Sequence, residues 1–163
     1  MTADTATHDD HWFDAVFRAH AAAVQRYFLR RAAPGDAEDL AAEVLTIAWR
    51  RREDVPDGAE LPWLYRTAGF VLANHRRKMS AVPMAEPPET VDDEDPVDAV
   101  VADDQVRRAL AGLSARDREV LLLHAWEGLG GEELAAALGI SRGGADAALS
   151  RARSRLAAAW AQV

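Results

Sequence analysis

Apolar residues recur every three or four positions along most of the chain, in two groups of segments. In the N-terminal part this helical period runs through residues 12–31, 37–52 and 62–78, and in the C-terminal part through 114–129 and 132–156. No segment between them alternates apolar and polar residues for long enough to predict a β-strand. The pattern therefore predicts an all-α protein.

The two groups of predicted helices are separated by an acidic, proline-rich stretch. Residues 81–105 contain nine acidic side chains, four prolines and no basic side chain. A segment of this composition buries too little apolar surface to offset the entropy lost on ordering, and it is typical of a linker. We therefore expect a disordered tail at 1–11, two small helical domains at 12–80 and 106–163, and a flexible acidic linker at 81–105.

Residues 132–156 carry the pattern of a helix-turn-helix. Gly139 permits a left-handed turn, Ala135 four positions earlier allows two helices to touch, and Ser141 is a suitable N-cap for the second helix. An αα-hairpin within a helical bundle is the alternative interpretation. The apolar wedge between the two helices would consist of Leu134, Leu138, Ile140 and Leu149.

The net charge of −8 at first argues against a nucleic-acid partner, because phosphate binding usually requires a basic surface. The acidity is concentrated in the predicted linker, however, where the net charge is −9. Residues 1–80 carry −1 and residues 106–163 carry +2. Charge therefore does not exclude either helical domain from binding nucleic acid.

The predicted helix at 62–78 combines aromatic side chains with cations. Bases of single-stranded DNA stack on aromatic rings while cations contact the backbone, so this combination favours a single-strand binding surface. The alternative is a set of core aromatics followed by a solvated basic helix end. The side chains concerned are Trp63, Tyr65, Arg66, Phe70, Arg76, Arg77 and Lys78.

Catalytic and metal-binding chemistry find no support in the sequence. The chain lacks cysteine and a glycine-rich phosphate loop. Its five histidines are dispersed, with His8 and His11 in the predicted tail and His124 beside Glu127 on one helix face. No apolar run reaches the roughly 18 residues of a membrane span, and the N-terminus lacks a secretory signal. We therefore predict a cytoplasmic protein that does not insert into membranes, is not an enzyme and uses no metal or other cofactor.

Three segments, in this order and spacing, resemble bacterial sigma factors of the extracytoplasmic-function (ECF) group, which contain only regions 2 and 4. DAEDLAAEVLTIAW at 36–49 is similar to region 2.2, WLYRTAGFVLANHRRK at 63–78 to regions 2.3 and 2.4, and residues 109–156 to region 4. The resemblance implies a protein that binds core RNA polymerase and directs promoter-specific transcription initiation. Its implied partners are the β′ clamp helices and β flap of the polymerase, promoter DNA and an anti-sigma factor.

The resemblance also implies roles for individual side chains. Region 2.2 would bind the β′ clamp helices, and regions 2.4 and 4 would read the −10 and −35 promoter elements. The implied polymerase-binding residues are Asp36, Glu38, Asp39, Leu40, Glu43 and Val44, of which the two apolar ones are equally suited to the core. The implied −10 residues are Arg66, Phe70, Asn74, Arg76, Arg77 and Lys78. The implied −35 residues are Ser141, Arg142, Gly143, Gly144, Ala145 and Arg151.

The sequence departs from the family pattern in the predicted recognition helix, where GGADAAL stands in place of the usual GTVKSRL. Gly144, Asp146 and Ala148 thus replace threonine, lysine and arginine, and Phe70 replaces an asparagine of region 2. Aspartate near phosphates lowers affinity, and each missing cation removes about one unit of salt dependence. We predict a working sigma factor with a weak or unusual −35 preference.

Two alternatives remain at this point. The first is a sigma-like decoy that binds an anti-sigma factor or polymerase without reading promoters, which the bare recognition helix and Phe70 favour. The second is an ordinary helix-turn-helix repressor, which would leave the N-terminal helical domain without a role.

Overall fold

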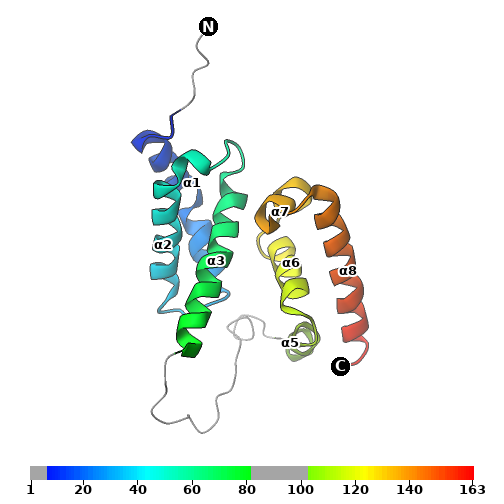
Figure 1. Ribbon diagram of the computed structural model, residues 1–163. Coiled ribbons are helices and arrows are strands. Elements are labelled where there is room, and N and C mark those ends of the chain that lie inside the picture. Colours follow the sequence, from blue (N-terminus) through cyan, green and yellow to red (C-terminus); the bar gives the residue numbers. More distant parts are fainter. Residues whose placement is uncertain (1–6, 82–102) are drawn as a thin grey trace. The chain divides into compact units, whose positions relative to one another are not determined.

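In a computed structural model of the protein, residues 7–81 and 103–163 are described, and every regular element within them is a helix (Figure 1). The chain divides into two compact units, residues 1–81 and 82–163, which we call unit 1 and unit 2. Most of the predicted linker and the first six residues of the predicted tail lie outside the described residues. The prediction of an all-α fold is confirmed.

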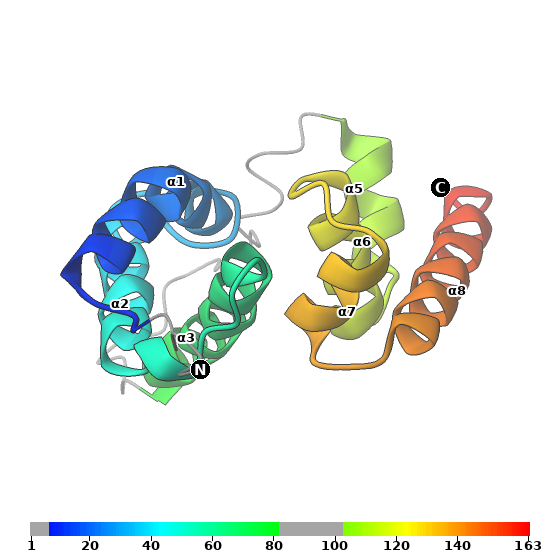
Figure 2. The same cartoon turned by 90° about the horizontal axis from the view of Figure 1, so that it is seen from above.

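Unit 1 is built from three helices that all pack on one another: α1 (Asp10–Leu29), α2 (Ala37–Arg50) and α3 (Glu60–Ala81). A short 3-10 helix, η1 (Arg52–Asp54), begins the connection from α2 to α3. Viewed from above, the three long helices surround a common core (Figure 2). The side chains buried most completely in this core include Val24, Tyr27, Phe28, Val44 and Leu64.

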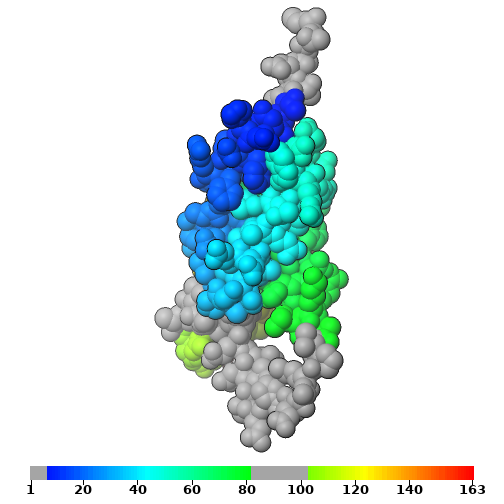
Figure 3. Space-filling view, turned by 90° about the vertical axis from the view of Figure 1, so that its left-hand side faces the viewer, coloured from blue at the N-terminus to red at the C-terminus, as the bar shows by residue number. Residues whose placement is uncertain are grey.

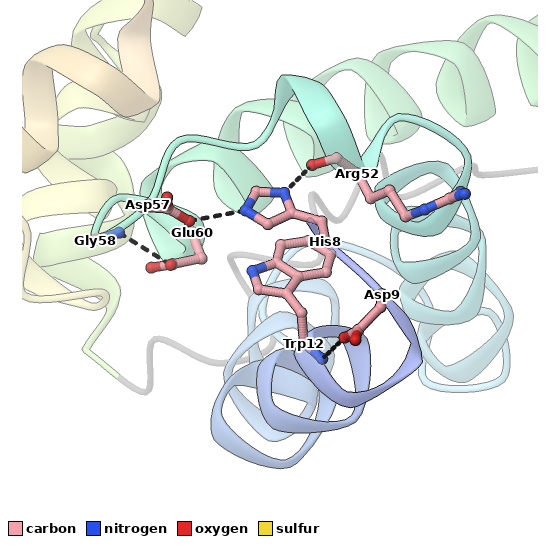
Figure 4. A network of polar contacts seen from close by, with 7 residues as sticks. All are labelled: His8, Asp9, Trp12, Arg52, Asp57, Gly58 and Glu60. Carbon is pink, nitrogen blue, oxygen red and sulfur yellow. Dashed lines mark hydrogen bonds and ion pairs between the residues drawn. The ribbon is translucent and has the colours of Figure 1, made fainter. Parts of the chain in front are cut away.

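Part of the predicted disordered tail is packed into unit 1, so that prediction is wrong for residues 7–11. His8 is only 6% exposed, and its ring stacks on Trp12 with the centroids 4.1 Å apart (Figure 4). Its Nδ1 donates to the Arg52 carbonyl, and its Nε2 donates to Asp57 Oδ1 at 2.7 Å. These partners lie 44 and 49 residues away in the chain. The segment is therefore ordered by tertiary contacts, which no local sequence pattern shows.

This arrangement, which we call the His8 latch, ties the start of α1 to the connection between α2 and α3. Both ring nitrogens of His8 face acceptors, so both must carry a proton. The hydrogen bond to the Arg52 carbonyl and then the one to Asp57 raise the pKa of His8 above 6.5. Asp9 caps α1, since its carboxylate accepts a hydrogen bond from the Trp12 N–H at 3.0 Å.

The described part of unit 2 contains α5 (Asp104–Ala111), α6 (Ala115–Ala125), α7 (Gly131–Leu138) and α8 (Arg142–Trp160). The long helix α8 packs against each of the other three. Asp103 caps α5, because its carboxylate accepts hydrogen bonds from the backbone N–H groups of Gln105 and Val106. Helix α5 therefore begins inside the stretch that was predicted to be linker.

The turn between α7 and α8 has the predicted geometry. Gly139 has a φ of 67°, in the left-handed region that glycine adopts without strain. Ser141 caps α8, with its Oγ accepting a hydrogen bond from the Gly144 N–H at 3.1 Å. Leu134 and Leu149 are buried between the helices. The local signals of the helix-turn-helix are confirmed in this part of the chain.

The starts of α6 and α2 differ in how they are capped. Ser114 caps α6, because its Oγ accepts a hydrogen bond from the Asp117 N–H at 3.1 Å. Asp36 occupies the N-cap position of α2 but makes no capping hydrogen bond. Its carboxylate instead lies 3.4 Å from Nε2 of His75 in α3. Asp36 therefore makes a tertiary contact in place of a local capping hydrogen bond.

Candidate functional site

The outer surface of α2 carries three of the carboxylates predicted to bind the polymerase. Glu38, Asp39 and Glu43 are exposed, and none of them forms an ion pair with another described residue. In the space-filling view of Figure 3 the surface of α2, in cyan, lies between α1, in blue, and α3, in green. We call these three side chains the α2 acidic face. Asp36 differs from them, because its carboxylate is already paired with His75.

Leu40 and Val44, the two apolar members of the predicted polymerase-binding set, are core residues. Leu40 is 5% exposed and Val44 is 0% exposed. Each directly follows an acidic residue, Asp39 or Glu43, and adjacent residues point about 100° apart around a helix, so the carboxylates are exposed while the apolar side chains are buried. Of the two roles that the sequence left open for these residues, their burial favours the core.

The residues predicted to read the −10 element lie on α3, where most of them form one exposed stripe. Phe70 is 65% exposed, and the guanidinium of Arg66 lies 5.9 Å from the centroid of its ring. One turn further on, the Arg77 guanidinium donates to Asn74 Oδ1. Lys78 is also exposed. The α3 stripe, defined as Arg66, Phe70, Asn74, Arg77 and Lys78, thus presents an exposed aromatic ring with one cation beside it and two more further along the helix.

Arg76 is separated from this stripe by its hydrogen bond. Its guanidinium donates to the carbonyl oxygen of Arg31, just after α1, at 3.3 Å. Arg31 is itself buried, with its guanidinium carbon 3.8 Å from the ring centroid of Tyr27. Arg76 therefore helps to hold α3 against the end of α1, a role that the sequence did not indicate.

A groove of about 400 Å³ runs between α2 and α3 beside the α3 stripe. It combines an acceptor in Glu43, donors in Arg51 and Arg66, and apolar walls that include Trp63. Such a lining suits a planar heterocycle with polar edges. The remaining lining residues are Ile47, Thr67, Phe70, Val71 and Asn74.

Sequence reasoning missed the contribution of α2 to this groove. Glu43 was predicted to face the polymerase, and Ile47 and Arg51 were given no site role. These three residues are spaced by four, and so are Trp63 and Thr67 on the opposite helix. The matched four-residue spacing on two helices that pack together is the signal that could have indicated a shared groove.

In unit 2 the residues predicted to read the −35 element cluster at the start of α8. Arg142 is exposed, with Nη1 lying 3.8 Å from Glu132 Oε1 and Nε lying 3.9 Å from Asp146 Oδ2. Gly143 is also exposed, and a Cβ added there would meet no atom within 4 Å. Ala145 is 0% exposed because it packs in the core of unit 2. The prediction that Ala145 contacts DNA is therefore wrong.

The arginines further along α8 have different environments. Arg153 donates to Nε2 of His124 at 2.9 Å, and Nδ1 of His124 donates to the Leu129 carbonyl at 2.7 Å. Arg155 donates to both carboxylate oxygens of Asp117. Arg151 is exposed and forms no ion pair within residues 7–81 and 103–163. Of these arginines, Arg151 is the one best placed to contact a DNA phosphate.

The described residues hold no group of three histidine, aspartate or glutamate side chains arranged to bind a metal ion. Both ring nitrogens of His8 and of His124 are engaged in hydrogen bonds with the protein itself. In the same residues, no helix has both the length and the apolar character needed to cross a membrane.

Two family models match the chain, one in each unit. Residues 16–81 match Sigma-70 region 2, and residues 103–156 match Sigma-70, region 4. The ECF RNA polymerase sigma factor SigF of Caulobacter vibrioides (strain NA1000 / CB15N) is 35% identical over 141 residues, covering 82% of this chain and 77% of that protein. The ECF RNA polymerase sigma factor SigL of Mycobacterium tuberculosis (strain ATCC 25618 / H37Rv) is 31% identical over 139 residues, covering 79% and 77%.

Solved structures share the fold. The sigma factor RpoE in complex with the anti-sigma factor NepR from Bartonella quintana gives a TM-score of 0.60 at 22% identity, over 90% of this chain and 95% of that chain. CnrH in complex with the cytosolic domain of CnrY gives a TM-score of 0.60 at 21% identity, over 92% and 88%. The matches to regions 2 and 4 and to the curated relatives go further than the fold: the chain belongs to the family of ECF RNA polymerase sigma factors.

Proposed function

We propose that this sigma factor works in the cytoplasm, where it binds core RNA polymerase and directs promoter-specific transcription initiation without catalysing a reaction itself. The observation that carries the proposal is the presence, within unit 1, of both the unpaired α2 acidic face and the exposed aromatic and cationic α3 stripe. The first surface suits docking to a basic protein, and the second suits a single DNA strand. A subunit that opens promoters on the polymerase needs both.

The α2 acidic face is our candidate for the contact with the β′ clamp helices of the polymerase. Exposed carboxylates that have no partner within the described protein attract a basic surface at long range and orient it on arrival. Asp39 lies in the first turn of α2, where the helix dipole also favours a negative charge. Leu40 and Val44 support this face from beneath and do not belong to it.

The α3 stripe is our candidate for the contact with the −10 element. A base that leaves the stack of the duplex can lie on the exposed ring of Phe70, and stacking of this kind contributes about 1–3 kcal/mol per base. Arg66 and Lys78 are placed to bind phosphates on either side of the ring. The groove between α2 and α3 can receive the edge of such a base, because donors and acceptors line it.

The start of α8 is our candidate for the contact with the −35 element. Gly143 lacks a side chain and lies on the exposed surface, so α8 can approach the floor of the DNA major groove closely. Arg142 can bind a guanine edge, and Arg151 can bind a phosphate two turns further on. Ser141 and Gly144 act through the cap, which fixes the direction of the helix.

An anti-sigma factor is the further partner that we propose. The solved relative RpoE is a sigma factor in complex with the anti-sigma factor NepR. In the present chain, a protein that covered the α2 acidic face or the α3 stripe would block polymerase binding or strand binding directly.

The second candidate function is a decoy that binds polymerase or an anti-sigma factor but does not read promoters. Asp146 is the observation that favours it, because an exposed carboxylate at the start of α8 opposes contact with DNA phosphates. The two functions differ in a single outcome, which is the production of promoter-specific transcripts.

The first test is co-elution of the full chain with core RNA polymerase at moderate salt, followed by transcription from a library of genomic fragments. The sigma function predicts a one-to-one complex and transcripts with defined start sites. A complex without specific transcripts would favour the decoy. A folded sample that does not bind the polymerase would overturn the proposal.

A further inference from the structure

The exposed face of the first two turns of α8 has almost no side-chain chemistry apart from two charged residues. Gly143 and Ala147 are exposed but carry no polar group, and Ala145 is buried. Arg142 and Asp146 are exposed, and they stand four residues apart on neighbouring turns. Side-chain hydrogen bonds from these two turns to base edges must therefore come from Arg142 and Asp146.

Asp146 contributes little to the fold. Its side chain is 60% exposed, and its ion pair with Arg142 at 3.9 Å is a loose surface pair within one helix. Exposed pairs of this kind add little to the stability of a helix. A carboxylate in this position also repels the phosphates of any DNA that α8 approaches. A favourable contact with a base edge would give the residue a function that offsets this repulsion.

A carboxylate accepts hydrogen bonds and cannot donate them, which limits the bases that Asp146 can select. In the major groove the amino groups of cytosine N4 and adenine N6 are the donors. Adenine also presents its N7 acceptor beside N6, and this lone pair would face the carboxylate. Cytosine presents no acceptor of its own on that edge, so a carboxylate favours cytosine.

Arg142 has the complementary preference, because a guanidinium donates two hydrogen bonds to O6 and N7 of guanine. Nε of Arg142 and Oδ2 of Asp146 lie 3.9 Å apart, which is close to the rise of about 3.4 Å of one base-pair step. The two side chains therefore reach neighbouring base pairs more readily than a single one.

Arg142 is also oriented before DNA arrives. Its guanidinium lies between Glu132 and Asp146. The central carbon of the guanidinium, Cζ, is 3.6 Å from the position that a Cβ on Gly131 would take. Both ion pairs are long, at 3.8 and 3.9 Å, so a base edge can replace either of them. Asp146 therefore needs no rearrangement of the fold to exchange its contact with Arg142 for one with DNA.

We propose that Asp146 is a specificity-determining residue, which accepts a hydrogen bond from the N4 amino group of a cytosine in the −35 element, next to a guanine bound by Arg142. This inference rests on the proposed sigma function and names the sequence that unit 2 selects. In place of the weak or unusual −35 preference expected from the sequence, the proposal assigns to unit 2 a definite preference for two neighbouring G·C pairs.

The test uses holoenzyme assembled from core RNA polymerase and the full chain, on templates with a fixed −10 element and a randomised −35 element. Transcripts are sequenced for the wild type, Asp146→Asn and Asp146→Ala. The wild type should prefer cytosine at one position, on the order of tenfold over the other bases. Asp146→Asn should change that preference to adenine, because an amide both donates and accepts on the adenine edge. Asp146→Ala should abolish the preference at that position and leave the adjacent guanine preference intact.

Glu133→Gln is the matched control, since it removes one exposed negative charge from α7. It should leave every base preference unchanged. A uniform gain of transcription from all templates in both Asp146 variants would mean that the residue only repels phosphates, and it would overturn the proposal. A wild type that transcribes without any cytosine preference would also overturn it. Absence of transcripts from every template would instead be a failure of the sigma function itself.

Discussion

Arg155 of α8 donates two hydrogen bonds to the carboxylate of Asp117 in α6, at 2.9 and 2.7 Å. The Asp117 side chain is almost fully enclosed, while that of Arg155 is largely exposed. The pair joins the first turn of α6 to the C-terminal half of α8, at positions 38 residues apart in the chain. The hydrogen bond from Arg155 is the largest cause of a pKa of Asp117 below its ordinary value of 3.8.

This pair makes the stability of unit 2 depend on pH, because acid removes its contribution. Because the pKa of Asp117 is depressed in the folded state, the ionised carboxylate stabilises the fold above pH 3.8, and this contribution is lost as the pH falls through the folded-state pKa. Arg155→Gln should therefore lower the midpoint of thermal unfolding near neutral pH. The difference from the wild type should shrink below pH 3.8. Arg116→Gln, which removes an exposed arginine charge from α6, the helix of Asp117, serves as control, and an equal effect of both variants would contradict the prediction.

The His8 latch has the opposite pH dependence. The pKa of His8 is raised above 6.5, so its contribution to stability is fully present below pH 6.5 and is lost as the pH rises through the folded-state pKa. His8→Gln should lower the free energy of unfolding of unit 1 by about 1–2 kcal/mol under mildly acidic conditions, and by less in alkaline buffer. Denaturant titration at the two pH values measures this difference. His11→Gln changes an exposed histidine of α1 and should have no such effect; a loss independent of pH in His8→Gln would contradict the latch.

Charge reversal at the α2 acidic face should weaken polymerase binding. Asp39→Arg places a cation where the proposed partner is basic, and we expect the Kd for core RNA polymerase to rise by about tenfold or more, with a steep dependence on salt. Fluorescence anisotropy of the labelled chain measures the affinity. Asp14→Arg, an equivalent reversal on the exposed surface of α1, is the control. Equal affinities of the Asp39 variant and the wild type would remove α2 from the docking surface.

Removal of the exposed ring from the α3 stripe should impair promoter opening without harm to the fold. Phe70 is 65% exposed, so Phe70→Ala should leave the midpoint of thermal unfolding almost unchanged. Loss of one stacked base should reduce the yield of open complexes by about tenfold. Permanganate reactivity of unpaired thymines reports this yield on a mapped promoter. Met79→Ala, at another exposed apolar position of α3, should be neutral, and a normal yield with Phe70→Ala would exclude the ring from strand binding.

The sequence predicts those elements of the fold that depend on local interactions. Gly139 and Ser141 act within a few residues of their own position, and the structure confirms both roles. The His8 latch and the ion pair of Asp36 with His75 were not predicted. Both contacts join residues far apart in the chain. Asp36 could have capped α2 locally, but its carboxylate lies against His75 instead.

The sequence predicted which helices carry the candidate surfaces, but not which of their residues are exposed there. Helical spacing placed Leu40, Val44 and Ala145 on the same helices as functional residues, yet it does not show which side of a helix its neighbours cover. Burial removed all three from the candidate surfaces. The groove was missed for the same reason, because it exists only where α2 and α3 pack together, and residues of both helices line it.

The bare surface at the start of α8 has a practical consequence for engineering. A Cβ added at Gly143 would meet no atom within 4 Å, and most replacements there would also raise the helix propensity by up to about 1 kcal/mol. The opposite side of α8, with Ala145 and Ala152 fully buried, would stay untouched. Helix α8 can therefore be refitted with new recognition residues one at a time, which makes this chain a starting scaffold for orthogonal promoter and sigma factor pairs in synthetic gene circuits.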